Sequence, residues 1–124
     1  MKYLLDSNIV IAAALGIGAA LHERMAGCDE GDIGTSSVAY AEVIYGSTRG
    51  KPPALDRLKT FLEEVSILDF DAAAAEAYAA LPFRRSSFDQ LIAAHALSRG
   101  LILVTDNVRH FRNVANLRVE NWTV

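Results

Sequence analysis

The chain has 124 residues, of which 52% are hydrophobic and 22% are charged. This composition is typical of one globular domain spanning 1–124, and it excludes a disordered or collagen-like chain. The single cysteine, Cys28, excludes a disulfide framework and a cysteine-based zinc cluster, and it favours a cytoplasmic protein. The net charge of −3 disfavours a protein that grips nucleic acid through bulk positive charge alone. Metal ions bound to some of the acids would reverse that balance, so nucleic acid stays open as a partner.

The periodicity of apolar residues predicts alternating strands and helices. In chain order these are a strand at Tyr3–Leu5, helices at 9–15 and Ala19–Ala26, a strand at Ile33–Ser36, helices at 38–45 (closed by Gly46) and 55–65, a strand at 67–70, helices at 72–81 and Phe88–Arg99 (closed by Gly100), and strands at 101–105 and 117–119. The strands are apolar throughout, as in a sheet that is covered on both faces. The fold class predicted is α/β, a three-layer α/β/α sandwich with a central, mostly parallel sheet.

The uncharged segment 9–21 is the only stretch that resembles a targeting signal. A membrane-spanning helix needs about 20 apolar residues, which is more than this segment offers. Asp6 stands just before the segment, and Gly16 and Gly18 interrupt it. We interpret it as buried core, with no membrane association.

Four carboxylates stand alone in otherwise uncharged stretches: Asp6, Glu42, Asp89 and Asp106. Carboxylates are seldom buried unless they are paired or bound to metal, because desolvation costs several kcal/mol. Asp6 and Asp106 each follow a predicted strand, and ligand sites in parallel sheets lie beyond the carboxyl ends of strands. Oxygen donors gathered there suit Mg²⁺ or Mn²⁺, which can activate water for phosphodiester hydrolysis.

Each acid also has a purely structural interpretation. Asp6 and Asp89 can cap the helices that follow them, Glu42 can lie on a solvated helix face, and Asp106 can belong to a turn. The histidines lack zinc-like spacing, and His95 is predicted to pack against the core. No Ser–His–Asp arrangement is readable, which disfavours a serine hydrolase.

The same segments resemble the PIN-domain ribonucleases, in particular the VapC toxins of prokaryotic toxin–antitoxin pairs. The resemblance is carried by KYLLDSNIVI, SSVAYAEVIYG, FDQLIAAHALSRGLILVTDN and NLRVENW, which together run nearly end to end. It places the acidic motif positions of the family at Asp6, Glu42 and Asp89. The fourth position falls at Asn107, and the adjacent Asp106 is the alternative. The stretch LPFRRSSF before Asp89 is shorter than is usual in the family.

The resemblance implies a Mg²⁺- or Mn²⁺-dependent endoribonuclease that cuts structured RNA such as tRNA or ribosomal RNA. Asp6, Glu42, Asp89 and Asp106 would be its catalytic and metal-binding residues, with Asn107 as the alternative fourth position. The resemblance also implies a homodimer and a VapB-like antitoxin partner. Arg84 and Arg85, just before Asp89, are candidate contacts to the RNA backbone; their alternative role is to solubilise the loop.

Two other function classes can be weighed against this one. A phospho-receiver domain would need a lysine after a late strand, and no lysine follows Lys59. A PIN-like module that binds RNA or a partner without cutting stays open. Stabilisation by Mg²⁺ or Mn²⁺ would favour the nuclease over the binding module.

Overall fold

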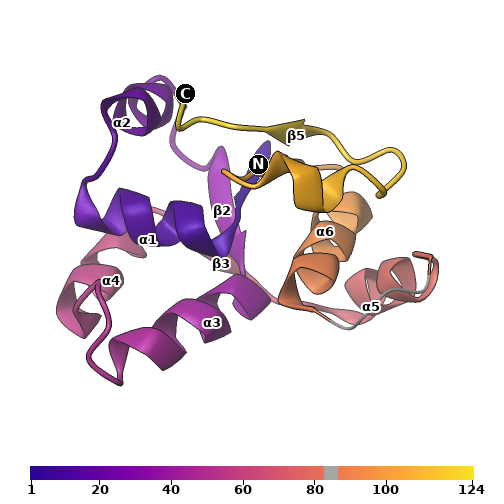
Figure 1. The fold of residues 1–124 in the computed structure, drawn as a ribbon, viewed down its shortest axis with the longest axis horizontal. Coiled ribbons are helices and arrows are strands. Elements are labelled where there is room, and N and C mark those ends of the chain that lie inside the picture. The colour runs from indigo at the N-terminus through magenta and orange to yellow at the C-terminus, as the bar shows by residue number, and fades with distance from the viewer. Residues whose placement is uncertain (83–86) are drawn as a thin grey trace.

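The computed structural model describes residues 1–82 and 87–124 (Figure 1). Its sheet contains five strands in the order β3-β2-β1-β4-β5, all parallel. The strands are β1 (Tyr3–Leu5), β2 (Ile33–Ser36), β3 (Ser66–Leu68), β4 (Ile102–Val104) and β5 (Val119–Glu120). The central strand, β1, pairs Leu4 with Gly34 on one side and with Leu103 on the other. The predicted α/β class is confirmed, and the described sheet is wholly parallel.

Helices cover both faces of the sheet, so the chain forms three layers. The helices are α1 (Ser7–Leu15), α2 (Ala19–Ala26), α3 (Ser37–Ser47), α4 (Leu55–Phe61), α5 (Ala72–Ala79), α6 (Phe88–Arg99) and the 3₁₀ helix η1 (Val108–Phe111). In Figure 1, α1, α3 and α4 lie on one side of the strands, and α5 and α6 lie on the other. Among the described helices, no single one is long and apolar enough to cross a membrane. Helices α1 and α2 together have the required length and composition, but the chain bends by 94° between them.

Successive residues of the central strands belong to two separate hydrophobic cores, because side chains alternate between the two faces of a sheet. Leu5 and Val104 pack with the helices α1, α3 and α4, together with Trp122 near the C-terminus. Leu4 and Leu103 pack on the opposite face against α6 and η1. All four of these strand residues are fully buried. The continuous apolar strands in the sequence therefore reflect a sheet that is buried on both sides.

Several boundaries differ from the prediction. Helix α3 continues through Gly46 to Ser47, and α4 ends at Phe61, where the predicted helix reached residue 65. Gly46 keeps an ordinary helical position with the Lys51 side chain packed over it, whereas Gly100 adopts a φ of 65° and ends α6 as predicted. Helix η1 was not anticipated; it places His110 next to α6.

Candidate active site

The candidate site lies at the carboxyl edge of the sheet. Asp6 directly follows β1, and Thr105 directly follows β4. Helix α3 begins where β2 ends, with Ser36 as its N-cap residue. Because the strands are parallel and adjacent, these three chain segments leave the sheet at the same edge. The topology thus brings residues from distant parts of the sequence to one place.

Asp6 is held by two hydrogen bonds at the centre of the site. Its Oδ1 accepts a hydrogen bond from the Ser7 N–H at 2.8 Å, and its Oδ2 accepts one from the Thr105 hydroxyl at 2.7 Å. The side chain is buried, with 5% of its surface exposed. Asp6 is also the N-cap residue of α1, as the structural interpretation of this acid predicted. Capping occupies part of the carboxylate and leaves further lone pairs free to act as ligands.

Glu42 is joined to Asp6 through Ser7. The Ser7 hydroxyl donates a hydrogen bond to Glu42 Oε1 at 2.7 Å, while the Ser7 backbone N–H bonds Asp6. Glu42 is half-buried on α3, and Ser7 is buried at the start of α1. Ser7 therefore bridges two carboxylates, one that directly follows β1 and one that lies within α3. Glu42 points into the site and is not simply a residue of a solvated helix face.

Asp89 lies in the first turn of α6 and contacts His110 of η1. The His110 Nδ1 is 3.0 Å from Asp89 Oδ2 and 2.8 Å from Asn107 Nδ2. A ring nitrogen carries at most one proton, so Nδ1 cannot accept from the amide and donate to the carboxylate together. The carboxylate can only accept, so Nδ1 donates to Asp89, and the Asn107 amide then presents its oxygen to the ring. The helix cap is Ser87, which accepts from the Gln90 N–H; the capping alternative for Asp89 is wrong.

Asn107 and Asp106 occupy different environments. The Asn107 N–H donates to the Thr105 hydroxyl at 3.0 Å, and its side chain meets His110. Asp106 is exposed, and no hydrogen bond links it to the other acids among the described residues. A hydrogen-bonded chain thus runs from Glu42 through Ser7, Asp6, Thr105, Asn107 and His110 to Asp89.

The site gathers negative charge that no lysine or arginine of the described residues pairs with. Burial is the main cause that raises the pKa of Asp6, and the charges of Asp89 and Asp106 add to it, against the hydrogen bonds from Thr105 and Ser7. Burial likewise raises the pKa of Glu42, with further repulsion from Asp6 and Asp89 and an opposing hydrogen bond from Ser7. Across residues 1–82 and 87–124, no lysine or arginine forms an ion pair with these acids. A bound cation would relieve this unfavourable charge.

The donor chemistry of the site fits a hard divalent cation. The carboxylate and amide oxygens of Asp6, Glu42, Asp89 and Asn107 are ligands that Mg²⁺ and Mn²⁺ accept. Within the described part of the chain, however, no three acidic, histidine or cysteine side chains stand close enough together to hold one ion as they are. The hydroxyl of Ser7 and the imidazole of His110 separate them. The donor groups therefore lie at one edge of the sheet, but the side chains that hydrogen-bond to them keep them too far apart to share one ion.

Sequence reasoning missed the residues that link the acids: Ser7, Thr105 and His110. Ser7 and Thr105 each stand next to an aspartate shortly after a strand ends, a signal that could have singled them out. His110 carries no such signal, because its contact with Asp89 spans 21 residues and depends on η1. Arg84 and Arg85 lie outside the described residues, so their expected contact with RNA stays a prediction.

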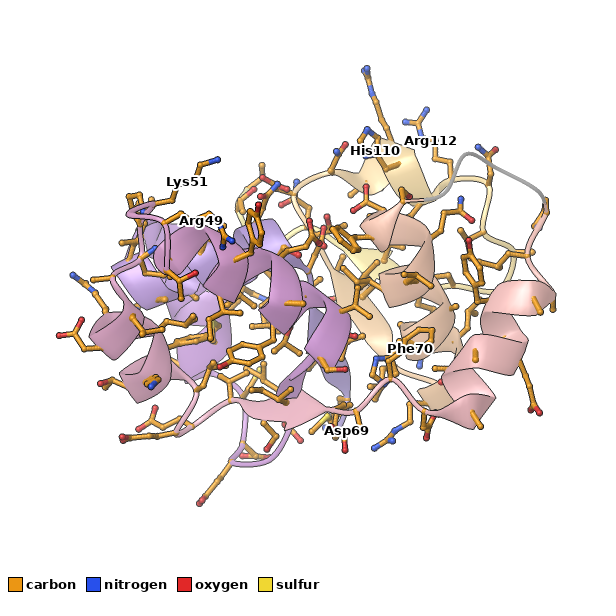
Figure 2. The ribbon with its side chains drawn as sticks, turned by 90° about the horizontal axis from the view of Figure 1, so that it is seen from below. Arg49, Lys51, Asp69, Phe70, His110 and Arg112 are labelled. Atoms are coloured by element: carbon orange, nitrogen blue, oxygen red, sulfur yellow. The ribbon has the colours of Figure 1, made fainter. Side chains whose placement is uncertain are left out.

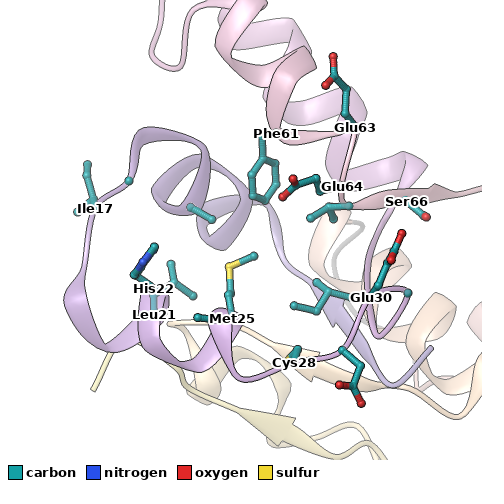
Figure 3. Close-up of a pocket in the computed structure, with 17 residues that line it drawn as sticks. Ile17, Leu21, His22, Met25, Cys28, Glu30, Phe61, Glu63, Glu64 and Ser66 are labelled. Carbon is teal, nitrogen blue, oxygen red and sulfur yellow. The ribbon is translucent and has the colours of Figure 1, made fainter.

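A hollow in the described surface lies elsewhere (Figure 3). It has a volume of about 770 Å³ and lies near Ile33 and Ser66, which begin β2 and β3. Its lining includes the apolar Leu21 and Phe61 and the acidic Glu63, among others. None of the four predicted acids lines it. The hollow is therefore at the amino edge of the sheet, opposite the site described above.

Comparisons with known proteins agree with this architecture. The PIN domain family model matches residues 3–117. The tRNA(fMet)-specific endonuclease VapC of Shigella flexneri is 37% identical over an alignment of 132 residues, covering 99% of each chain. Ribonuclease VapC2 of Haemophilus influenzae is 34% identical over 131 residues, covering 98% of each.

Solved structures show the same fold over nearly the full length. A chain of VapBC2 from Rickettsia felis, bound to a DNA fragment from its promoter, superposes with a TM-score of 0.87 at 29% identity, covering 98% of this chain and 99% of that one. A chain of DNA-bound VapBC from Salmonella typhimurium gives a TM-score of 0.83 at 30% identity, covering 98% of each. The chain thus belongs to the PIN-domain family and, within it, to the VapC ribonucleases.

Proposed function

We propose that this chain is a metal-dependent endoribonuclease, the toxin of a toxin–antitoxin pair, and that it hydrolyses phosphodiester bonds in structured RNA such as tRNA or ribosomal RNA. The observation that carries the proposal is the set of carboxylates at the carboxyl edge of the sheet, buried or half-buried without a lysine or arginine partner in the described residues. Such an arrangement is costly for stability and is useful when a cation binds. The name of the Shigella flexneri relative supports tRNA as a substrate class.

In this proposal Asp6, Glu42 and Asp89 hold Mg²⁺ or Mn²⁺, and Asn107 completes the site. We favour Asn107 over Asp106, because Asn107 is hydrogen-bonded into the site whereas Asp106 is exposed. Asp106 instead adds negative charge near Asp6. The bound cation would supply an activated water and stabilise negative charge on the phosphate.

The protein's own groups hold these donors in place. Thr105 and Ser7 each hold one oxygen of Asp6 by a hydrogen bond. The remaining lone pairs of these two oxygens are available to a cation. The Ser7 hydroxyl orients Glu42, and His110 orients Asp89. Such supporting hydrogen bonds typically change metal affinity or activity by about 10- to 100-fold when they are removed.

The proposal includes a VapB-like antitoxin partner and action in the cytoplasm, where tRNA and ribosomes are found. The solved relatives from Rickettsia felis and Salmonella typhimurium are VapBC structures, which supports such a partner. The homodimer stays a prediction, and the molar mass of the purified chain in solution tests it.

The test is cleavage of a tRNA transcript and of total RNA by the purified chain with Mn²⁺, Mg²⁺ or chelator. Asp89→Asn is the site variant, and Asp56→Asn is the matched control, because Asp56 is an exposed acid on α4. We expect discrete fragments with either metal, none with chelator or Asp89→Asn, and normal cleavage by the control. A folded, antitoxin-free chain that cleaves neither RNA would contradict the proposal and favour the non-cleaving binding module.

A further inference from the structure

The face of α3 that carries Glu42 continues into an exposed aromatic residue. Tyr45 follows Glu42 by one helical turn, and residues three apart lie on the same face of a helix. Tyr45 is 62% exposed, which is unusual for so large a ring. Since Glu42 points into the acidic site, Tyr45 lies beside that site, about one turn further along α3.

Arg49 is fixed against this ring. Its guanidinium carbon lies 3.5 Å from the centroid of the Tyr45 ring, a cation–π contact. One guanidinium nitrogen also donates to the Tyr45 carbonyl at 3.1 Å and to the Thr48 hydroxyl at 3.4 Å. The side chain is thus ordered before any ligand arrives, and its remaining N–H groups are free to bind an anion.

The positive charge at this end of α3 has no acidic partner among the described residues. Arg49 and Lys51 are both exposed, and neither forms an ion pair with an acid in residues 1–82 or 87–124. Both fold back on the end of α3, where their backbone N–H groups bond the Gly46 carbonyl at 3.0 and 2.9 Å. In Figure 2, Arg49 and Lys51 lie in the upper left part of the molecule, and His110 and Arg112 lie in its upper right part.

We propose that Tyr45 and Arg49 form an RNA-binding site beside the acids: an unpaired base stacks on the Tyr45–Arg49 pair, and Arg49 contacts a backbone phosphate. The inference rests on the proposed nuclease function and deepens it. A chain of net charge −3 repels RNA, most strongly at its acidic site, so cations beside that site are needed to hold the backbone. Aromatic rings and arginine planes are the groups on which proteins stack unpaired bases.

The test measures binding of fluorescein-labelled tRNA and of labelled oligouridylate by fluorescence anisotropy, in the Asp89→Asn background to prevent cleavage. We expect Tyr45→Ala to weaken binding on the order of 10-fold and Tyr45→Phe to retain it, because stacking needs the ring and not the hydroxyl. Arg49→Ala should weaken binding. It should also make the slope of log affinity against log salt concentration less steep, by about the contribution of one phosphate contact. In the wild-type background the same variants should raise KM more than they lower kcat.

Arg118→Ala is the matched control. It removes the same charge from an exposed residue just before β5, at the amino edge of the sheet. Equal weakening by Arg118→Ala, or unchanged RNA affinity in Tyr45→Ala and Arg49→Ala, would overturn the proposal. Unchanged RNA affinity with a loss of oligomeric state in Tyr45→Ala would assign the pair to an interface between copies of this chain and also overturn it. A wild-type chain that binds RNA through these residues without cutting it would contradict only the proposed nuclease function.

Discussion

The imidazole Nδ1 of His110 lies 3.0 Å from Asp89 Oδ2, and this contact closes the hydrogen-bonded chain that links the acids of the site. Asp89 comes from the first turn of α6, and His110 comes from η1. The two helices are separated in sequence by β4, so the pair fixes how the two segments meet beyond the sheet. The carboxylate of Asp89 is thereby oriented by a residue that itself contacts Asn107.

We predict that His110→Ala lowers Mn²⁺ affinity and RNA cleavage by about 10- to 100-fold, as is typical when a residue that orients a metal ligand is lost. His110→Gln, which keeps an N–H donor for Asp89, should recover part of both. Calorimetric titration with Mn²⁺ gives the affinity independently of activity. Wild-type affinity and cleavage in His110→Ala would show that Asp89 needs no such support.

Glu42→Gln should separate stability from function. Because burial raises the pKa of Glu42 above its ordinary value of 4.5, the ionised side chain at neutral pH costs the folded chain free energy. Glutamine keeps an oxygen that accepts from the Ser7 hydroxyl and removes the charge. The metal-free variant should therefore unfold at a higher temperature than the wild type.

The same variant should lose its response to Mn²⁺. A ligand at 100 times its Kd stabilises a folded protein by about 2.7 kcal/mol, and we expect a gain of this kind in the wild type but not in Glu42→Gln. Thermal unfolding with and without Mn²⁺ measures both effects. Glu76→Gln, an exposed residue on α5, is the control and should respond like the wild type. A Glu42→Gln variant that is still stabilised by Mn²⁺ would exclude Glu42 from the metal site.

The buried His95 makes stability depend on pH. Its ring is fully buried, its Nδ1 lies 2.7 Å from the Ser36 hydroxyl, and its Nε2 has no hydrogen-bond partner among residues 1–82 and 87–124. Burial, and secondarily the charge of Arg99, lower the pKa of His95 from its ordinary value of 6.5, against weaker opposing effects of Asp71 and Asp69. The unfolded chain therefore takes up a proton more readily than the folded chain.

It follows that His95 reduces stability as the pH falls below about 6.5 and has no such effect above it. The raised pKa values of Asp6 and Glu42 act in the opposite direction at lower pH, so the comparison needs a variant. Urea unfolding between about pH 7.5 and pH 5.5 should show that the wild type loses more stability than His95→Gln. An equal loss of unfolding free energy in the two chains over this pH range would contradict this role for His95.

Ser87→Ala should destabilise the chain by about 1 kcal/mol, the usual cost of losing an N-cap side chain. The Ser87 hydroxyl accepts from the Gln90 N–H at 3.3 Å at the start of α6, the helix that carries Asp89. Ser87→Asp provides an equivalent oxygen and should keep the stability. Urea unfolding of the three chains tests the prediction; equal midpoints with alanine and serine would show that the cap contributes nothing.

Much of the fold was readable from the sequence because a parallel sheet buried on both faces has apolar strands. The Tyr3–Leu5 and Ile33–Ser36 strands and the Phe88–Arg99 helix were predicted with the bounds that the structure shows. The extent of α3 was not, because the sequence does not show whether a glycine near a helix end turns left-handed and stops the helix there. Gly100 does so with a φ of 65°, whereas Gly46 stays helical.

The isolated acids could be singled out as candidate site residues because a single charge in an apolar stretch is conspicuous in the sequence. The groups that link them could not, because their contacts join residues far apart in sequence. Thr105 reaches Asp6 across 99 residues, and Ser7 reaches Glu42 across 35. Hydroxyl groups near strand ends are common, and the pairing of β1 with β4 and with β2 decides which of them meets a carboxylate.

The chemistry of the RNA ends produced by cleavage tests the central claim most directly. Hydrolysis by water at a carboxylate-held cation breaks the phosphodiester without using the ribose 2′-hydroxyl. We therefore predict that fragments made from tRNA with Mn²⁺ carry 5′-phosphate and 3′-hydroxyl ends, and that chelator abolishes their formation. Fragments with 2′,3′-cyclic phosphate ends that persist in chelator would contradict the account.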